Sequence, residues 1–184
     1  MAAAAATFPE NDARPVKLFF EDEGRFGRMG EPFPCWAPRG ERPTVSVQLI
    51  RQYTHVFSAV CPSDGQSLSL VLPYANATAM KLFLQECSEQ WKGYRVFMVM
   101  DKAAWHRSAG LGESENIRII HQPSYSPELN PVEHFWEYIR ERCLRNHLWT
   151  ALADLEETLA VVLKTLMESA DIIQSVVGFH WAII

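Results

Sequence analysis

The sequence of 184 residues has no closely spaced pair of cysteines and no long apolar run. Its four cysteines are scattered without a C-x-x-C pair, so neither a zinc site nor a disulfide framework is expected. We expect free thiols in a reducing cytosol instead. No run is long enough to span a bilayer, and the alanine-rich start lacks the basic region and apolar core of a signal peptide. We therefore expect a soluble, cytoplasmic protein with no membrane partner.

The chain also lacks an excess of basic residues, since its net charge is −5. Nucleic-acid binding depends on Lys and Arg side chains that neutralise phosphates, so this balance argues against strong DNA binding by the chain alone. The objection weakens if part of the acidic excess forms a cluster that holds cations, or if a basic segment elsewhere supplies the general affinity. With 48% hydrophobic and 21% charged residues, the composition is that of one globular domain.

The first half of the chain predicts strands around one long loop. Residues 1–15 begin with an alanine run and are expected to form a disordered leader, with the domain over residues 16–184. Residues 16–22 predict a strand whose apolar stripe ends in Asp22, and strand parity places Glu21 and Glu23 on the opposite face. Residues 24–43, rich in Gly, Pro and Arg, predict a long loop.

The middle of the chain predicts a meander, a helix and a second apolar strand. Residues 45–50, 53–60 and 67–72 favour an antiparallel meander, and a helix to about residue 91 follows a cap at Asn76 or Thr78. The helix carries a stripe at helical spacing, namely Met80, Phe83, Leu84 and Cys87. Residues 95–101 form a nearly continuous apolar run that ends in Asp101, so both faces of this strand should be covered. A short strand at residues 117–120 comes next.

Residues 123–136 predict the start of a helix. Asn130 suits the N-cap, Pro131 the first helical position, and Glu133 then falls in the first turn. This helix, to about residue 146, buries one stripe that includes Trp136, and further helices are expected at residues 151–169 and 170–177. The order of elements predicts an α/β fold with a mixed sheet flanked by helices.

Three carboxylates are expected to meet. Asp22 and Asp101 each close an apolar strand, and Glu133 opens a helix. If the two strands are parallel neighbours, their carboxyl ends lie together, where open α/β sheets bind ligands. An all-oxygen set suits Mg²⁺ or Mn²⁺, and two ions roughly 3.5–4 Å apart would support in-line displacement at phosphorus. A second interpretation of Glu133 is a capping box with Asn130, which needs no metal.

Four segments carry a resemblance to a known family: residues 21–26, 36–40, 101–106 and 126–133. They look like the catalytic-domain motifs of mariner-superfamily transposases, in the bacterial insertion-sequence branch. The resemblance implies a ribonuclease-H-like fold with a mixed five-stranded sheet, and a D-D-E triad at Asp22, Asp101 and Glu133. It also implies cut-and-paste transposition of double-stranded DNA into TA dinucleotides with Mg²⁺ or Mn²⁺, in an active homodimer on the bacterial nucleoid.

Two departures from the family pattern leave alternatives open. Lys102 stands where the family commonly has Asn, beside the expected metal site. Nothing upstream of Val16 matches the helix-turn-helix region that members usually carry, so a separate upstream half is an expected partner. The alternatives are a truncated, non-catalytic fragment that regulates or is inert, and a structure-specific nuclease. Residues expected to contact DNA are Arg25, Arg39, Lys102, His106 and Arg140, with a purely structural role left open for His106.

Overall fold

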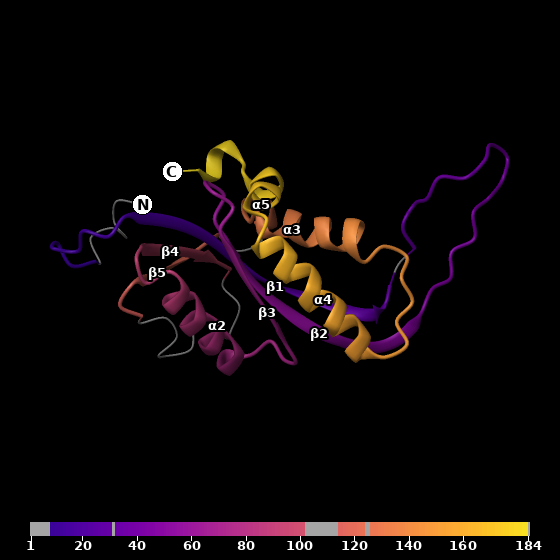
Figure 1. The fold of residues 1–184 in the computed structure, drawn as a ribbon, viewed down its shortest axis with the longest axis horizontal. Coiled ribbons are helices and arrows are strands. Elements are labelled where there is room, and N and C mark those ends of the chain that lie inside the picture. The colour runs from indigo at the N-terminus through magenta and orange to yellow at the C-terminus, as the bar shows by residue number, and fades with distance from the viewer. Residues whose placement is uncertain (1–7, 31, 102–113, 124–125, 184) are drawn as a thin grey trace.

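The fold is built on one mixed five-stranded sheet, in a computed structural model that describes residues 8–30, 32–101, 114–123 and 126–183. The strand order is β3-β2-β1-β4-β5 (Figure 1). Strand β2 is antiparallel to both β1 and β3, whereas β4 is parallel to β1 and β5 is parallel to β4. The expected α/β class and the meander are confirmed. The strands are β1 (Val16–Met29), β2 (Leu49–Val60), β3 (Ser67–Leu72), β4 (Arg95–Met100) and β5 (Ile117–His121).

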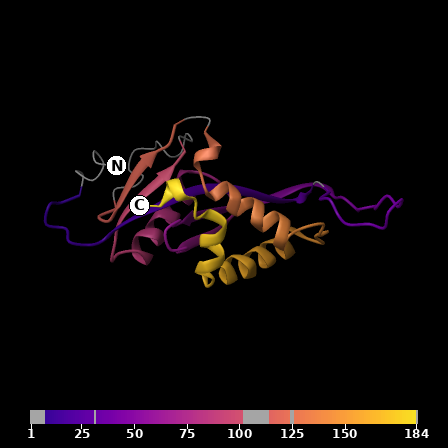
Figure 2. The same ribbon diagram turned by 90° about the horizontal axis from the view of Figure 1, so that it is seen from above.

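Helices cover both faces of this sheet. Successive strand residues point to opposite sides, and apolar side chains on both sides are buried. Helix α2 covers one face, where Phe19 and Met98 are buried, and the other helices cover the second face, where Leu18 and Phe97 are buried. Strand β4 is thus covered on both sides, as its apolar run predicted. The helices are α2 (Ala77–Gln90), α3 (Val132–Tyr138), α4 (Leu152–Met167) and α5 (Ala170–Val177), with the last three grouped together in Figure 2.

Short helical turns complete the element list, and one of them shortens a predicted helix. The helix expected to run to about residue 146 ends as α3 at Tyr138. The chain continues from there as a π-helical turn, in which the N–H of Leu144 donates to the carbonyl of Ile139, five residues earlier, over 3.1 Å. Asn146 then adopts a left-handed φ of 51° and ends the run. The short turns are η2 (Pro127–Leu129), η3 (Ile139–Cys143) and η4 (His180–Ala182).

The loop predicted at residues 24–43 begins later than expected, because β1 continues to Met29, whereas residues 32–43 do lie outside helices and strands. Gly24 pairs with Val56 of β2, and Gly27 pairs with Tyr53, so the long neighbouring strand supplies the hydrogen bonds that the local composition did not suggest. Gly24 also has a packing role. A Cβ there would lie 2.8 Å from the Phe26 ring and 3.0 Å from the Trp136 ring, so the absent side chain makes room for an indole.

Strand β2 also differs from expectation, and the segment before it projects from the body. Residues 45–50 and 53–60, predicted as two strands, are joined in the single strand Leu49–Val60, and residues 45–48 lie outside it. Pairing with β1 holds both segments in one strand, although the register shifts between Tyr53 and Leu49, where the break was expected, and β3 pairs only with residues 55–60. Residues 32–48 extend away from the sheet in both Figure 1 and Figure 2.

Part of the expected leader has defined contacts. Phe8 is buried, with its ring edge-on to the ring of Phe97 at a centroid distance of 5.3 Å. Arg14 pairs with Asp12 and donates to the carbonyl of Lys92, after α2. Among the described helices, none is long and apolar enough to cross a membrane.

The tight turn between β2 and β3 provides a test of the packing of α5. Gly65 has a φ of +72°, and a Cβ at this position would lie 1.8 Å from the carbonyl oxygen of Ala170. We expect Gly65→Ala to lower the free energy of unfolding by about 3–4 kcal/mol, since backbone strain and a backbone clash add. Urea denaturation measures this loss.

Gly40 is the matched control, because its φ is +92° and nothing lies within 4 Å of the position of its Cβ. Gly40→Ala is expected to cost only the backbone term, about 1–2 kcal/mol. Equal losses in the two variants would show that contact with α5 does not constrain Gly65.

Candidate active site

The pairing of β1 with β4 brings two aspartates side by side. The strands are parallel, and their register runs from Val16 opposite Arg95 to Phe20 opposite Val99. Continued by two residues past its last pair, this register would bring Asp22 level with Asp101, which directly follows β4. The expectation of parallel neighbours is confirmed. Asp22, however, does not end its strand; it lies where β4 stops and β1 continues alone with β2.

Asn130 attaches the start of α3 to β1 beside these aspartates. Its side-chain Nδ2 donates to the carbonyl of Glu21 over 3.2 Å, and its Oδ1 accepts from the Val132 N–H over 3.2 Å. Asn130 therefore satisfies a helix N–H as predicted, although the helix begins one residue later and Pro131 occupies the N-cap position. The first turn of α3 is thereby held next to Asp22.

Glu133 lies in that first turn with an exposed side chain. The capping-box interpretation required its carboxylate to accept from the N–H of Asn130. That N–H instead donates to the carbonyl of Pro127 over 2.9 Å, so the capping box does not form. The carboxylate of Glu133 is left beside Asp22, and its charge is one of the causes that raise the pKa of Asp22.

Trp136 is part of the core and also contacts the site. The side chain is 1% exposed, as the helical stripe predicted, and its indole N–H donates to Asp22 Oδ2 over 3.0 Å. Sequence reasoning assigned Trp136 to the core and missed this contact. The available signal was chemical, because a buried indole N–H usually finds an acceptor.

The environment of Asp22 favours its neutral form. Burial raises its pKa from 3.8 to about 6, the charges of Glu133 and Glu23 act in the same direction, and the hydrogen bond from Trp136 opposes them. Removal of water from a carboxylate disfavours the charged form, whereas a donor or a nearby cation favours it. Below about pH 6 a positive ion at this position would therefore compete with a proton for Asp22.

Glu21 occupies the opposite face of β1, as strand parity predicted. It is fully buried on the α2 side, and neither carboxyl oxygen has a hydrogen-bond partner in the part of the chain that the structure describes. Burial raises its pKa well above the usual range, with the charges of Glu23, Asp22 and Asp101 adding to the effect. A side chain so enclosed does not face the exposed carboxylate of Glu133.

The three expected metal ligands supply only carboxylate oxygens, a set that matches Mg²⁺ or Mn²⁺. Within the described ranges, no group of three or more His, Cys, Asp or Glu side chains is close enough to hold a metal ion. The charges of Glu133 and Asp22 act on one another, but within the described residues the carboxylates of Asp22, Asp101 and Glu133 do not form a closed cluster. The bonds from the Trp136 indole and from the Glu23 backbone N–H use two of about four acceptor positions on Asp22 and leave the rest for a ligand.

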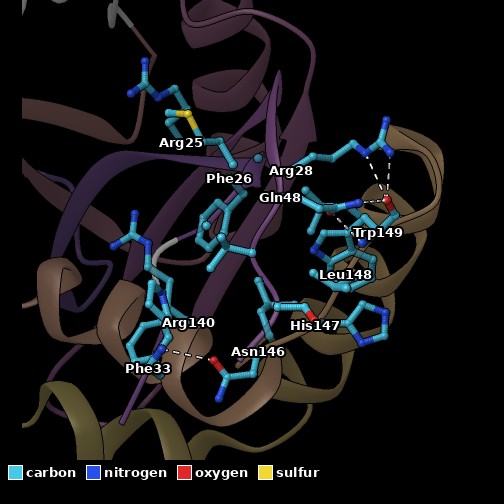
Figure 3. Close-up of a pocket in the computed structure, with 18 residues that line it drawn as sticks. Arg25, Phe26, Arg28, Phe33, Gln48, Arg140, Asn146, His147, Leu148 and Trp149 are labelled. Carbon is cyan, nitrogen blue, oxygen red and sulfur yellow. Dashed lines mark hydrogen bonds between the residues drawn. The ribbon is translucent and has the colours of Figure 1, made fainter. Parts of the chain in front are cut away.

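Two of the residues expected to contact DNA line one pocket. Arg25 follows Asp22 along β1, Arg140 follows Glu133 in the turn after α3, and both line a pocket whose lining does not include the three carboxylates (Figure 3). Arg39 is exposed on the projecting segment and does not line this pocket. Lys102 and His106 lie outside the described residues.

The raised pKa of Asp22 predicts a pH-dependent difference in stability for Asp22→Asn. A raised carboxyl pKa means that the folded state holds a proton that the unfolded state releases from about pH 4 to 6, so unfolding free energy falls as pH rises through this window. The loss is on the order of 2–3 kcal/mol. The uncharged variant lacks this loss. Without metal, its free energy of unfolding should therefore equal that of the wild type near pH 3.5 and exceed it above pH 6.

Urea denaturation in a chelating buffer, from acid to neutral pH, measures this difference. Titrating groups that do not interact with Asp22 are common to both proteins and cancel, whereas the pKa of Glu21, which the Asp22 charge also raises, changes the difference in the same direction. A stability difference that does not vary with pH would contradict the assigned pKa.

A Trp136→Phe variant keeps an aromatic ring and removes the N–H donor. Because that donor lowers the pKa of Asp22, its loss should raise the pKa further and reduce the free energy of unfolding by about 1–3 kcal/mol. An NMR titration of the Asp22 carboxyl carbon measures the pKa. The control is Trp149→Phe, which removes an indole from the other end of the same core and should leave the pKa of Asp22 unchanged. An unchanged Asp22 pKa in Trp136→Phe would contradict the positioning role of Trp136.

Known proteins match most of the chain. Residues 17–156 match the family described as DDE superfamily endonuclease. The chain is 32% identical over 131 residues to "Uncharacterized protein y4pE/y4sA" of Sinorhizobium fredii (strain NBRC 101917 / NGR234), a match that covers 71% of this chain and 97% of that protein. It is 25% identical over 146 residues to "Insertion element IS630 uncharacterized 39 kDa protein" of Shigella sonnei, covering 75% of this chain and 42% of that protein.

Solved structures of Mos1 transposase complexes share the fold. The Mos1 strand transfer complex matches with a TM-score of 0.60 at 16% identity, over 89% of this chain and 55% of that chain. The Mos1 mariner paired-end complex with Mn matches with a TM-score of 0.63 at 14% identity, over 86% and 53%. At such identities the likeness concerns the fold, which is the ribonuclease-H-like fold expected from the sequence. The resemblance to mariner-superfamily transposases is confirmed, and the chain belongs to the DDE superfamily endonuclease family.

Proposed function

We propose that the chain is the catalytic domain of a DNA transposase that cuts the ends of its element and joins them to target DNA. The observation that carries the proposal is the parallel pairing of β1 with β4, which supports a meeting of Asp22 and Asp101 just beyond the end of β4. Asn130 holds the first turn of α3, with Glu133, against the same part of β1. Membership of the DDE superfamily endonuclease family supports this assignment.

Asp22, Asp101 and Glu133 would hold two Mg²⁺ ions, or Mn²⁺ in their place. When bound, such ions supply activation of the attacking oxygen and stabilisation of the leaving oxygen in an in-line displacement at phosphorus. The protein's part is to orient the ligands. Trp136 fixes one oxygen of Asp22, and Asn130 fixes the approach of α3, so that little reorganisation is needed when DNA binds.

The reaction would proceed in two displacements. Water first attacks a phosphodiester at the element's end and releases a 3′-hydroxyl. The oxygen of that hydroxyl then attacks a target phosphodiester at a TA dinucleotide and displaces the 3′-oxygen of the target strand, so one phosphodiester is exchanged for another. Cut-and-paste transposition of this kind would take place in the cytoplasm, on the nucleoid.

The complete reaction would need partners beyond one copy of this chain. The chain spans 42% of the Shigella sonnei relative and 55% of the Mos1 chain, so those proteins contain further regions. We propose that recognition of the ends depends on an upstream helix-turn-helix half, and that the active species is a homodimer on double-stranded DNA. The net charge of −5 supports the need for such a DNA-binding half.

Cleavage of the element's ends, with the upstream segment supplied, tests the catalytic assignment. We expect Mg²⁺-dependent cleavage by the wild type and a loss of at least about 10²-fold in rate for Asp101→Asn and Glu133→Gln, the scale on which groups that stabilise transition-state charge act. Glu137→Gln is the matched control, since it makes the same change one turn further along α3 at an exposed position and should cleave normally.

Equal cleavage by Glu133→Gln and the wild type would refute the catalytic assignment of Glu133. A non-catalytic fragment would cleave no substrate and would gain no thermal stability from Mg²⁺. A structure-specific nuclease would instead cut generic hybrids or junctions in preference to the element's ends.

A further inference from the structure

A histidine at the end of β5 contacts the backbone of one of the three proposed metal ligands. Strands β4 and β5 run side by side (Figure 1), and their pairing ends at Met100 and His121. Asp101 follows directly, and its carbonyl oxygen lies 3.0 Å from Nδ1 of the exposed His121 ring. Because a carbonyl only accepts hydrogen bonds, Nδ1 carries the proton in this contact and donates.

Asp101 lies where the chain leaves the sheet. Successive carbonyls of a strand point towards opposite neighbours. The carbonyl of Met100 accepts from the N–H of Gln122 over 2.9 Å and so faces β5. In a regular strand the carbonyl of Asp101 would then face β1, but it bonds to His121 on the β5 side. The imidazole thus holds the direction in which the chain leaves β4.

The position of this carbonyl constrains the carboxylate of Asp101. A hydrogen bond to the carbonyl restricts rotation about the backbone bond from Cα to the carbonyl carbon, so the side chain keeps only its own torsions. Burial raises the pKa of Glu21 and the charge of Asp101 adds to this rise, so the carboxylate of Asp101 is near enough to β1 to act on it. A carboxylate that turned away from β1 could not share an ion with Asp22.

The bond from His121 matters more for the site than for the stability of the fold. A hydrogen bond from an exposed side chain adds little to the stability of a whole domain, because water competes for both groups. Hydrogen bonds that orient metal ligands have a larger effect on the site itself, since their loss commonly weakens metal binding by about 10- to 100-fold. The two effects can therefore be measured separately.

We propose that His121 is a positioning residue for metal binding, whose Nδ1–H fixes the carbonyl of Asp101 and so directs the carboxylate of Asp101 to the ion that it would share with Asp22. The metal part of this inference rests on the proposed function. The contact between His121 and Asp101 does not, and it is tested without metal.

Two replacements of His121 separate the roles of its two ring nitrogens. Asparagine places an N–H donor at the position of Nδ1, whereas glutamine extends to the position of Nε2. His121→Asn should therefore retain the bond to the carbonyl of Asp101, and His121→Gln and His121→Ala should lose it. His180→Ala is the matched control, because it removes another exposed histidine, in η4.

Binding of Mn²⁺ to the purified chain, followed by the electron paramagnetic resonance signal of the free ion, measures metal affinity without any cleavage. We expect His121→Ala and His121→Gln to bind Mn²⁺ about 10- to 100-fold more weakly than the wild type, and His121→Asn and His180→Ala to bind it nearly as tightly. In a chain that already carries Asp101→Asn, His121→Ala should add little further loss, because His121 acts through Asp101.

Hydrogen exchange in a chelating buffer tests the contact itself. The N–H of Gln122 donates to Met100, directly beside the bond from His121 to Asp101. Loss of the neighbouring bond should let this end of the ladder open more often. Relative to the intrinsic rate of each sequence, exchange at Gln122 should become about 2- to 10-fold faster in His121→Ala and stay near the wild-type rate in His121→Asn.

Equal Mn²⁺ affinity in His121→Ala and the wild type would overturn the inference, and so would an exchange rate at Gln122 that His121→Ala leaves unchanged. If His121→Gln restores the affinity and His121→Asn does not, the histidine acts through Nε2 and the positioning role is wrong. If the wild type binds no Mn²⁺ while exchange at Gln122 responds as expected, the proposed metal site and the metal part of the inference fail together, whereas the contact between His121 and Asp101 stands.

Discussion

The pairing of β1 with β4 is the constraint on which the site depends, because β4 ends while β1 continues. The parallel pairing ends at Phe20 and Val99, so Asp22 on β1 and Asp101 just after β4 both follow the point where the sheet loses one strand. Beyond it, pairing with β2 alone carries β1 on to Met29 and so delivers the arginines of the pocket. One strand thus supplies both the carboxylate and the neighbouring cationic surface, which fixes their separation.

Helix α3 couples this site to the hydrophobic core. Its start is attached to β1 through Asn130, and its buried face carries Trp136, whose N–H reaches Asp22. The indole is accommodated because Gly24 has no side chain, and it packs edge-on to Phe26 at a centroid distance of 5.7 Å. Packing of the core therefore sets the orientation of a carboxylate, so a substitution in the core would disturb the chemistry without touching the substrate.

Charges of opposite sign are separated over a short distance along the same two elements. Carboxylates gather where β4 ends, and their burial and mutual repulsion raise the pKa of Asp22 and of Glu21. The arginines follow further along β1 and in the turn after α3. The first group favours cations and the second favours phosphates, which are the two charged components of metal-dependent chemistry on DNA. This arrangement reconciles an acidic chain with the proposed nucleic-acid substrate.

By itself the sequence determined the class of fold, the helical stripe at Met80, Phe83, Leu84 and Cys87, the two-faced burial of β4, and the side of β1 on which Asp22 and Glu21 lie. These features follow from local periodicity and from which side chains avoid water. The catalytic roles of Asp22, Asp101 and Glu133 stay predictions from motif and chemistry. Only the tertiary structure decided the length of β1, the union of two predicted strands in β2, the partner of the Trp136 N–H and the assembly of the pocket. Each of these depends on contacts between residues far apart in the chain, where a distant strand or an indole outweighs the local preference of a glycine.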